Sequence, residues 1–314
     1  MTGSAGFAGS HLTRHLLAAG DSVLGVTLSA EWPPCLGDLA KSGVPLVAWD
    51  LSQDLGESAR RVIEDFAPEA IYHLAAISLP AACGADSPTP ASLAVNVEGS
   101  VRVAKLALEL PTRPKLLFVS SSKVYGPRDE STYLVDENAP LHPAGGYGLT
   151  KHLAEERLLA LAEQGLPLVI ARAFNHTGPG QEPVYLVPQW CQKQHQAESP
   201  VHVRSLNTTL DLSDVRDVVQ IYRRLMNTEQ ASGIVNVGSG HPTTTAEIWR
   251  GLCEISGYQG EVLAETDEVS HQPIADLSRL QSWIGPVERI PLAQTLKDTW
   301  DGVISAGGRV GEAR

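Results

Sequence analysis

The chain has few basic residues and no long apolar run. It holds 24 Lys and Arg against 36 Asp and Glu, which gives a formal net charge of −12 at pH 7. This charge argues against nucleic acid or an anionic membrane surface as a partner, because both would repel the protein. No apolar stretch approaches the roughly 20 residues needed to cross a bilayer. No basic and apolar leader follows Met1, so we expect a cytoplasmic protein.

Cysteine is scarce, and metal-binding motifs are missing. The four cysteines are Cys35, Cys83, Cys191 and Cys253. They form no C-x-x-C pair, which fits reduced thiols better than a disulfide framework. The histidines include no H-E-x-x-H motif. His11 and His15 share a predicted helix face, but no acidic partner or third ligand accompanies them, so we predict no metal site.

The composition is that of a soluble globular protein, and the first half of the chain has a regular rhythm. Hydrophobic residues make up 43% and charged residues 19% of the 314 residues. From residue 3 to about 174, apolar strand-like runs alternate with helical patterns, which is typical of βαβ units and a parallel sheet. The predicted strands are 22–27, 46–49, 70–74, 116–120 and 168–173, and the predicted helices are 9–19, 54–66, 91–110 and 147–164. We predict a doubly wound α/β fold.

Beyond residue 174 this rhythm breaks, because prolines interrupt shorter segments. We predict helices over 215–226, 244–256 and 292–303, the second opened by a capping box of Thr244 and Glu247. A strand over 233–237 is expected to return to the main sheet. Residues 305–314 are expected to fray. The pattern indicates a smaller, less regular second lobe.

Gly3, Gly6 and Gly9 form a G-x-x-G-x-x-G loop that opens the first predicted helix. Glycines there let backbone N–H groups approach a pyrophosphate at the positive end of the helix. Chance produces this spacing in about one such chain in five, but its position favours a dinucleotide site over a flexible N-terminus. A buried strand normally precedes the loop, where only Met1 and Thr2 stand here. We therefore favour a start upstream of Met1 over the loss of that strand's hydrogen bonds.

Tyr147 and Lys151 lie one helical turn apart, so their side chains leave the same face of a helix. A nearby ammonium favours the phenolate, so we expect Tyr147 to exchange a proton below its usual pKa of about 10. Such a tyrosine is a general acid or base for a carbonyl being reduced or an alcohol being oxidised. Chance gives the pair in about one chain in six, so its context decides.

Several segments, in order, resemble the extended short-chain dehydrogenases/reductases that act on nucleotide sugars, the NAD-dependent epimerase/dehydratase family. They are Gly3/Gly6/Gly9, Asp50-Leu51, His73-Leu74-Ala75-Ala76, Asn96 with Gly99, Ser120-Ser121-Ser122-Lys123-Val124-Tyr125-Gly126, Tyr147/Lys151, Arg172-Ala173-Phe174-Asn175 and Asp214-Val215. The resemblance covers nearly the whole chain. It implies a Rossmann-type NAD(P)-binding domain over 1–174 and a mainly substrate-binding lobe over 175–314. It also implies a homodimer through helices 91–110 and 147–164.

The resemblance also implies roles for single residues. Tyr147 would donate or accept the proton, Lys151 would hold the nicotinamide ribose, and Ser121 would hydrogen-bond the substrate oxygen. The implied cofactor contacts are Gly3, Gly6, Phe7, Ala8, Gly9, Asp50, Leu51, Leu74, Ala75, Ala76, Tyr147 and Lys151, and the implied substrate contacts are Ser78, Ser122 and Asn175. The alternative for Ser121 is a structural role in the turn at the end of a strand. For Asn96, a hydrogen bond to a neighbouring loop competes with direct catalysis.

Departures from the family pattern narrow the reaction. Dehydratases that resemble this chain carry an acid, often Asp-Glu, where this chain has Ser122 and Lys123, and a lysine is a poor substitute for a carboxylate base. Residues 172–181 and 214–219 look most like GDP-6-deoxy-D-mannose reductases, which implies reduction of the C4 ketone of a GDP-4-keto-6-deoxyhexose. A nucleotide-sugar 4-epimerase with tightly bound NAD is the alternative. A non-catalytic dinucleotide-binding protein is the third reading.

The substrate stays open, because two arginines expected to bind the diphosphate are absent. Leu210 stands where the family usually has one, and residues 269–273 lack the other. Arginine is hard to replace in phosphate recognition, although Arg204 or Lys193 could substitute.

The end of the second predicted strand bears on the cofactor. No acid stands there to bind the ribose of NAD, and no arginine follows to bind the extra phosphate of NADP. Thr27 or Ser29 could bond either group. The sequence therefore favours NADP(H), or the use of both cofactors.

Overall fold

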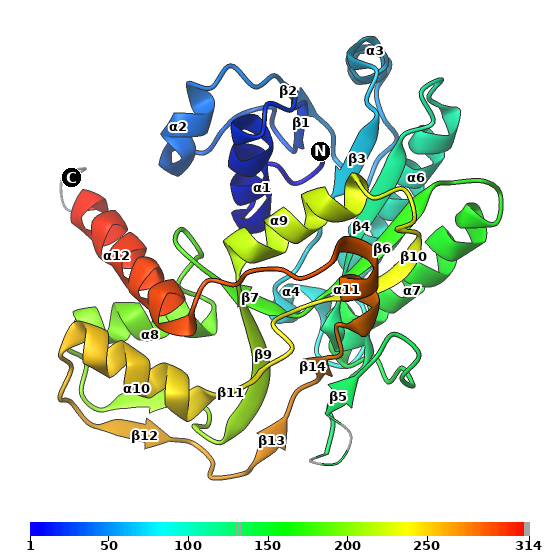
Figure 1. Cartoon of the computed structure of the whole chain (residues 1–314). Helices are drawn as coiled ribbons and strands as arrows, with labels where there is room; N and C mark the ends of the chain where they lie inside the picture. The colour runs from blue at the N-terminus through cyan, green and yellow to red at the C-terminus, as the bar shows by residue number, and fades with distance from the viewer. Residues whose placement is uncertain (130, 132, 311–314) are drawn as a thin grey trace.

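A parallel sheet lies at the centre of the molecule, with helices on both faces (Figure 1). The computed structural model describes residues 1–129, 131 and 133–310. Four strands run in the order β10–β6–β4–β3, and Thr2 bridges His73 of β3 to Val26 of β1, which pairs with β2. The strands are β1 (Gly25–Thr27), β2 (Leu46–Ala48), β3 (Ala70–His73), β4 (Lys115–Ser121), β6 (Leu168–Ala173) and β10 (Gly233–Val237).

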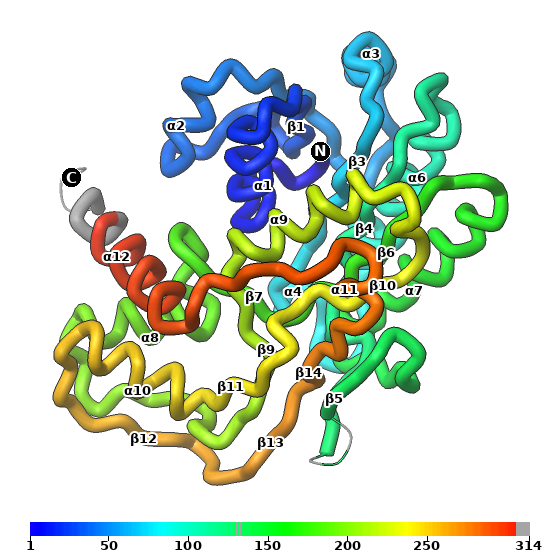
Figure 2. The backbone as a smooth tube through the Cα atoms, in the orientation of Figure 1, coloured from blue at the N-terminus to red at the C-terminus, as the bar shows by residue number. Residues whose placement is uncertain are grey.

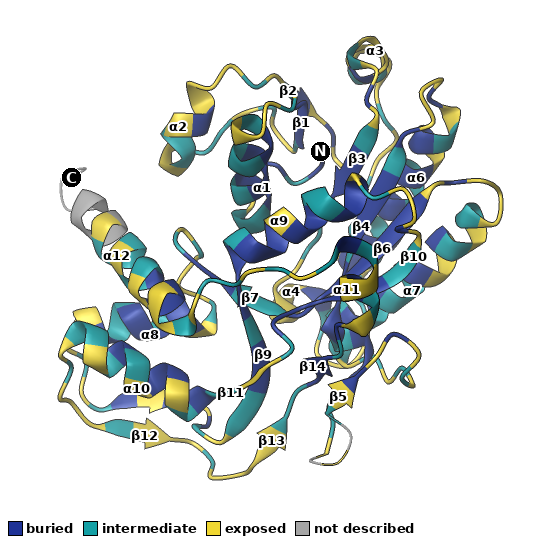
Figure 3. Cartoon of the chain, in the orientation of Figure 1, coloured by how far each residue is buried: buried dark blue, intermediate teal, exposed yellow. Residues whose placement is uncertain are grey.

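The side chains of the sheet alternate between two apolar cores. On β4, Leu117 joins the core that contains helices α1 and α9, whereas Leu116 and Phe118 join the core of α6 and α7. Figure 3 shows the strands buried between these two helical layers. The doubly wound α/β fold is confirmed. The helices of this half are α1 (Phe7–Ala18), α2 (Gly37–Ala40), α3 (Glu57–Phe66), α4 (Pro80–Cys83), α5 (Pro90–Ser92), α6 (Gly99–Glu109), α7 (Gly145–Ala162) and α9 (Val215–Met226).

The segment predicted as one helix over 91–110 is not uniform. It begins as α5, widens into a π-helical stretch over Leu93–Glu98 (η2), and continues as α6. Gly99 follows the wide turn, where a Cβ atom would lie only 2.8 Å from the Cβ of Leu51. The helices that would form the expected dimer interface, α6 and α7, pack against each other on one face of the sheet, and dimerisation itself stays a prediction.

A second lobe surrounds β9 and has its own apolar core. As predicted, β10 returns to pair in parallel with β6, and Thr244 and Glu247 form a capping box. Figure 2 shows the chain crossing between the lobes at α9 and β10 before it re-enters the second lobe at β11. The remaining elements are β5 (Leu134–Val135), β7 (Asn175–Thr177), α8 (Leu186–His195), β8 (Val201–Val203), β9 (Thr208–Asp214), β11 (Pro242–Thr244), α10 (Thr245–Ser256), β12 (Val262–Ala264), β13 (Ser270–His271), β14 (Ile274–Ala275), α11 (Ser278–Ile284) and α12 (Leu292–Val310), with the short turns η1 (Pro34–Leu36) and η3 (Ser122–Val124).

The end of the chain differs from the expectation. Helix α12 continues to Val310, beyond the predicted end at residue 303, and 311–314 lie outside the described residues. Fraying of the Gly-rich end stays a prediction. Among the described helices, none is both long and apolar enough to cross a membrane.

A buried ion pair joins helix α7 to the sheet. Arg172 of β6 and Glu155 of α7 lie 2.7 Å apart, and both side chains are only 2% exposed. The hydroxyl of Ser120 donates to the same carboxylate at 2.5 Å, and Arg172 donates to the Tyr125 hydroxyl at 3.0 Å. Each charge is therefore both paired and hydrogen-bonded, which offsets the cost of its burial.

We predict that Glu155→Ala strongly destabilises the fold, because it leaves the Arg172 guanidinium buried without its counter-ion. Loss of one partner of a buried pair costs about 3–5 kcal/mol, measured here as the free energy of unfolding in urea. The control is Glu57→Ala, which removes an exposed partner of Arg61 and leaves the urea midpoint unchanged. Equal midpoints for the two variants would contradict a stabilising role of the pair.

His73 of β3 links the sheet to the first residues of the chain. It is 1% exposed, its Nδ1 lies 2.6 Å from the Thr2 hydroxyl, and its Nε2 lies 2.9 Å from the Ser100 hydroxyl. Burial, with a smaller contribution from the Lys151 ammonium, lowers the pKa of His73 to about 3. The imidazole is therefore neutral in the folded protein at ordinary pH.

This neutral histidine predicts a loss of stability in acid. The unfolded chain binds the His73 proton near its usual pKa of about 6.5, and the folded protein binds it only near 3. The unfolded state thus holds more protons between these values, and stability falls as pH drops below 6.5, by about 2 kcal/mol at pH 5. Urea unfolding at pH 7 and pH 5 measures the slope, which should be shallower in His73→Gln. An identical slope in that variant would rule out His73 as its source.

Candidate functional site

The glycine loop brings the start of α1 close to the ends of the first strands. Gly3 adopts a φ of +72°, and a Cβ on Gly9 would lie 1.9 Å from the Gly3 carbonyl oxygen. Gly6 caps α1 without a side-chain hydrogen bond, so no side chain occupies the free N–H groups of the first turn. This arrangement suits a phosphate at the helix N-terminus.

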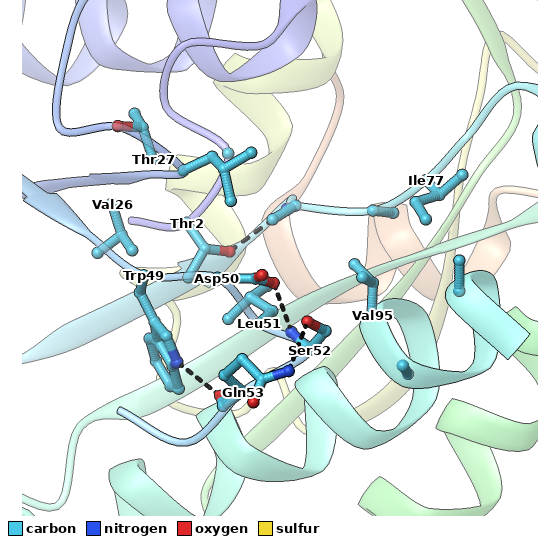
Figure 4. Close-up of a pocket in the computed structure, with 16 residues that line it drawn as sticks. Thr2, Val26, Thr27, Trp49, Asp50, Leu51, Ser52, Gln53, Ile77 and Val95 are labelled. Carbon is cyan, nitrogen blue, oxygen red and sulfur yellow. Dashed lines mark hydrogen bonds between the residues drawn. The ribbon is translucent and has the colours of Figure 1, made fainter. Parts of the chain in front are cut away.

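A cavity of about 670 Å³ opens beside the loop, at the carboxyl ends of β1, β2 and β3 (Figure 4). Its lining is mainly apolar, with a few polar groups, as in sites for adenosine-like ligands. The Thr27 hydroxyl is buried and has no hydrogen-bond partner. The lining residues are Thr2, Gly3, Val26, Thr27, Leu28, Trp49, Asp50, Leu51, Ser52, Gln53, Ala75, Ala76, Ile77, Ala91, Ala94 and Val95. These features fit the adenosine half of a nicotinamide dinucleotide.

Several of the predicted cofactor contacts lie in this cavity, and others do not. Gly3, Asp50, Leu51, Ala75 and Ala76 line it. The predicted contact Leu74 instead packs its side chain against the core of α1 and α9. The ring of Phe7 lies between two imidazoles, with centroid distances of 5.4 Å to His11 and 6.1 Å to His176.

The turn over residues 50–53 presents a carboxylate to the cavity. Asp50 Oδ1 accepts the Ser52 N–H at 2.9 Å, and the Ser52 side chain, followed by this backbone N–H, lowers the pKa of Asp50. The indole of Trp49 donates to the Gln53 carbonyl at 3.1 Å, which fixes the turn from its other side. Trp49 and Gln53 were not predicted from the sequence, although both flank the Asp50-Leu51 segment.

Asn96 holds the loop that follows β3. Its Oδ1 accepts the Ile77 N–H at 2.8 Å, and its Nδ2 donates to the Ile77 carbonyl at 2.9 Å. Nδ2 also donates to the Thr150 hydroxyl on α7 at 3.1 Å. The loop-bonding alternative for Asn96 is therefore the one observed.

Helix α7 and the end of β4 bring the predicted catalytic residues together. Lys151 donates to the Val119 carbonyl at 2.7 Å, and its Nζ lies 5.8 Å from the centre of the Tyr147 ring. The Ser121 side chain lies close enough to Tyr147 to lower the pKa of the phenol slightly, and it accepts the Lys123 N–H at 3.2 Å. Ser121 thus caps the strand-end turn beside the tyrosine, and its contact with the substrate oxygen stays a prediction.

The pKa of Tyr147 moves in the direction opposite to the expectation. Burial raises it well above its usual value, with smaller contributions from the nearby Cys83 and Tyr185, and the Ser121 side chain opposes the rise only weakly. Burial also lowers the pKa of Lys151 to about 8, against the pull of Glu155. The expectation of a lowered Tyr147 pKa was wrong, because desolvation of the buried phenol has the largest effect on its pKa. At neutral pH the site holds a phenol and an ammonium.

Two side-chain amides of the second lobe, those of Asn175 and Gln272, lie beside Lys123. Asn175 Nδ2 donates to the Asp211 carbonyl at 3.2 Å and to Gln272 Oε1 at 3.3 Å. Lys123 Nζ donates to the same Gln272 oxygen at 2.9 Å. Sequence reasoning missed Gln272, because it lies far along the chain in an irregular segment.

Two other side chains meet at the edge of the site. The predicted substrate contact Ser78 places its hydroxyl 3.2 Å from the hydroxyl of Tyr185, a residue that the sequence gave no reason to select. The predicted contact Ser122 is buried in η3. Tyr185 precedes α8 and lies close enough to raise the pKa of Tyr147.

Three positions were considered for diphosphate binding, and each has different surroundings in the structure. Leu210 is buried in the core of the second lobe. Lys193 donates to the His202 carbonyl and pairs with Glu198 at 3.8 Å, and Arg204 is exposed. In the part of the chain that the structure describes, no group of three or more His, Cys, Asp and Glu side chains could hold a metal ion.

We predict that Gly9→Ala weakens dinucleotide binding at least tenfold, because a Cβ there would collide with the Gly3 carbonyl and displace the loop. Titration with NADH, followed by its fluorescence, measures the affinity. Gly56→Ala is the matched control, because a Cβ at this N-cap of α3 meets open space. Unchanged affinity in a folded Gly9→Ala protein would contradict the placement of the cofactor on this loop.

Comparison with known proteins places this geometry in a family. Residues 1–238 match the NAD dependent epimerase/dehydratase family. GDP-6-deoxy-D-mannose reductase from Pseudomonas aeruginosa is 26% identical over 276 residues, covering 84% of this chain and 82% of that protein. A putative UDP-glucose 4-epimerase from Methanocaldococcus jannaschii is 31% identical over 175 residues, covering 54% of this chain and 55% of that protein.

A solved structure agrees over nearly the full length. The crystal structure of a putative epimerase from Burkholderia cenocepacia J2315 superposes with a TM-score of 0.84 at 29% identity, and the match covers 97% of each chain. The family description supports a nicotinamide dinucleotide as cofactor, which agrees with the glycine loop and the adjoining cavity. The chain belongs to the NAD dependent epimerase/dehydratase family.

Proposed function

We propose that the protein is an NAD(P)-dependent nucleotide-sugar oxidoreductase that reduces the C4 ketone of a GDP-4-keto-6-deoxyhexose. The observation that carries this proposal is the cluster of Ser121, Tyr147 and Lys151, in which burial keeps the proton on Tyr147. A ketone reductase begins its cycle with a protonated acid at this position. The similarity to GDP-6-deoxy-D-mannose reductase supports the choice of substrate.

Each residue of the cluster has a distinct part in this reaction. A bound nicotinamide would supply the hydride. Tyr147 protonates the oxygen at C4, and the Ser121 hydroxyl hydrogen-bonds that oxygen while it accepts the Lys123 N–H. Lys151, held by the Val119 carbonyl and lying over the Phe118 ring at 4.7 Å, stabilises the negative charge that develops on the phenol.

The lining of the cavity bears on the choice between the two cofactors. Asp50 contributes a carboxylate, and none of the lining residues is a lysine or arginine. A 2′-phosphate would gain no ion pair from this lining, so the arrangement favours NADH over NADPH. This preference differs from the sequence-based expectation of NADP(H) or of both cofactors, and a comparison of turnover with NADH and with NADPH decides between them.

A nucleotide-sugar 4-epimerase is the second candidate, supported by the similarity to the putative UDP-glucose 4-epimerase. It would use the same three residues, but Tyr147 would first remove a proton. Its expected signature is tightly bound NAD that copurifies with the protein, with interconversion of UDP-sugars and no net consumption of NADH or NADPH.

We predict that Tyr147→Phe reduces turnover of GDP-4-keto-6-deoxymannose at least 100-fold, because it removes the acid, and that it leaves dinucleotide affinity within about threefold. Absorbance at the reduced-nicotinamide band measures turnover. Tyr258→Phe is the control, since its hydroxyl bonds backbone carbonyls within the second lobe. Turnover retained by Tyr147→Phe, or no oxidation of either cofactor by the wild-type protein with this substrate, would refute the reductase proposal.

A further inference from the structure

Lys123 brings a second ammonium to the catalytic cluster. It is the middle residue of η3 and follows β4 by two residues, so its backbone N–H reaches the Ser121 hydroxyl at 3.2 Å. Its carbonyl accepts the Ala144 N–H at 3.2 Å, just before α7 begins. These two contacts tie Lys123 to the elements that carry Ser121 and Tyr147.

The ammonium of Lys123 has a neutral partner only. Nζ donates to Gln272 Oε1 at 2.9 Å, and no carboxylate of the described residues pairs with it. Its pKa is lowered by burial, with no opposing contribution from a negative group. In Lys151, by contrast, Glu155 opposes the effect of burial. A lysine ammonium has three N–H donors, so two remain for another acceptor.

The location of the Lys123 ammonium also favours an anionic ligand. The oxygen that Lys123 contacts also accepts the Asn175 side chain at 3.3 Å, so the ammonium lies where the two lobes meet. A half-buried ammonium without a counter-ion is costly, and an anion that enters with a ligand would offset that cost. The site therefore has an unmet preference for negative charge next to the start of α7, the helix that carries the proton donor Tyr147.

We propose that Lys123 binds an anionic oxygen of the substrate, on either the diphosphate or a carboxylate of the sugar, and thereby selects the substrate. This inference rests on the proposed function only in placing a nucleotide-sugar ligand beside Ser121 and Lys123. The 6-deoxyhexose proposed above has no carboxylate, so the carboxylate outcome would also replace that substrate with a sugar acid. A purely structural link between Lys123 and Gln272 would stabilise the fold without distinguishing charged ligands from neutral ones.

Calorimetric titrations with GDP, UDP, UDP-glucose and UDP-glucuronate test the inference on the wild type and on Lys123→Gln. We expect Lys123→Gln to bind the probes that carry the recognised anion at least tenfold more weakly than the wild type does. Lys123→Arg should bind the same probes within about threefold of the wild type. Uniform weakening for all four probes identifies the diphosphate as the anion. Weakening for UDP-glucuronate alone identifies a sugar carboxylate.

Two further variants separate charge recognition from folding. Lys115→Gln is the matched control, because Lys115 is a half-buried lysine at the opposite end of β4, bonded to the Leu225 and Thr228 carbonyls. It should leave all four affinities unchanged. Gln272→Glu supplies an internal counter-ion and should weaken the same probes as Lys123→Gln does, which keeps the test available if Lys123→Gln does not fold.

The proposal is overturned if Lys123→Gln and Gln272→Glu each bind all four probes within twofold of the wild type, or if the wild type binds none of them. Failure of the proposed reductase activity is a separate result. In that case the wild type oxidises neither NADH nor NADPH with a 4-keto sugar, while its affinity for the anionic probes still depends on Lys123.

Discussion

The buried ion pair between Glu155 and Arg172 is the contact on which the site depends. It fixes α7 against β4 and β6, so the helix that carries Tyr147 and Lys151 cannot slide along the sheet. Glu155 also lies one helical turn beyond Lys151 and favours its charged form against the effect of burial. Glu155 therefore both holds α7 on the sheet and favours the charged form of Lys151. Its loss would lower the stability of the fold and change the charge of the site.

The second lobe is attached to this framework through another buried carboxylate. Asp211 of β9 accepts the N–H groups of Ser239, Gly240 and Ala275 at 2.6, 2.9 and 3.1 Å. These N–H groups belong to the segment after β10 and to β14, so Asp211 joins the small lobe to the main sheet. Its own carbonyl positions Asn175. The amides of the second lobe thus reach the cluster on α7 through a defined hydrogen-bonded connection.

Local patterns in the sequence predicted much of the fold and the core of the site. The strands at 168–173 and 233–237 and the helix at 215–226 have the predicted bounds, because their apolar periodicity is a local property. The Tyr147/Lys151 spacing likewise fixed a shared helix face. Gln272 and Tyr185 escaped prediction because they reach the site from irregular segments. The direction of the Tyr147 pKa escaped because desolvation depends on the whole tertiary structure.

The amide of Asn96 has a consequence that extends beyond its own hydrogen bonds. It hydrogen-bonds both the N–H and the carbonyl of Ile77, as a neighbouring strand would, although it projects from the π-helical stretch η2. The loop after β3, which lines the cofactor cavity, is therefore held in place by a helix and not by the sheet from which it emerges. A change that moves Asn96 would therefore move Ile77, which lines the cavity, although Asn96 is not itself a lining residue.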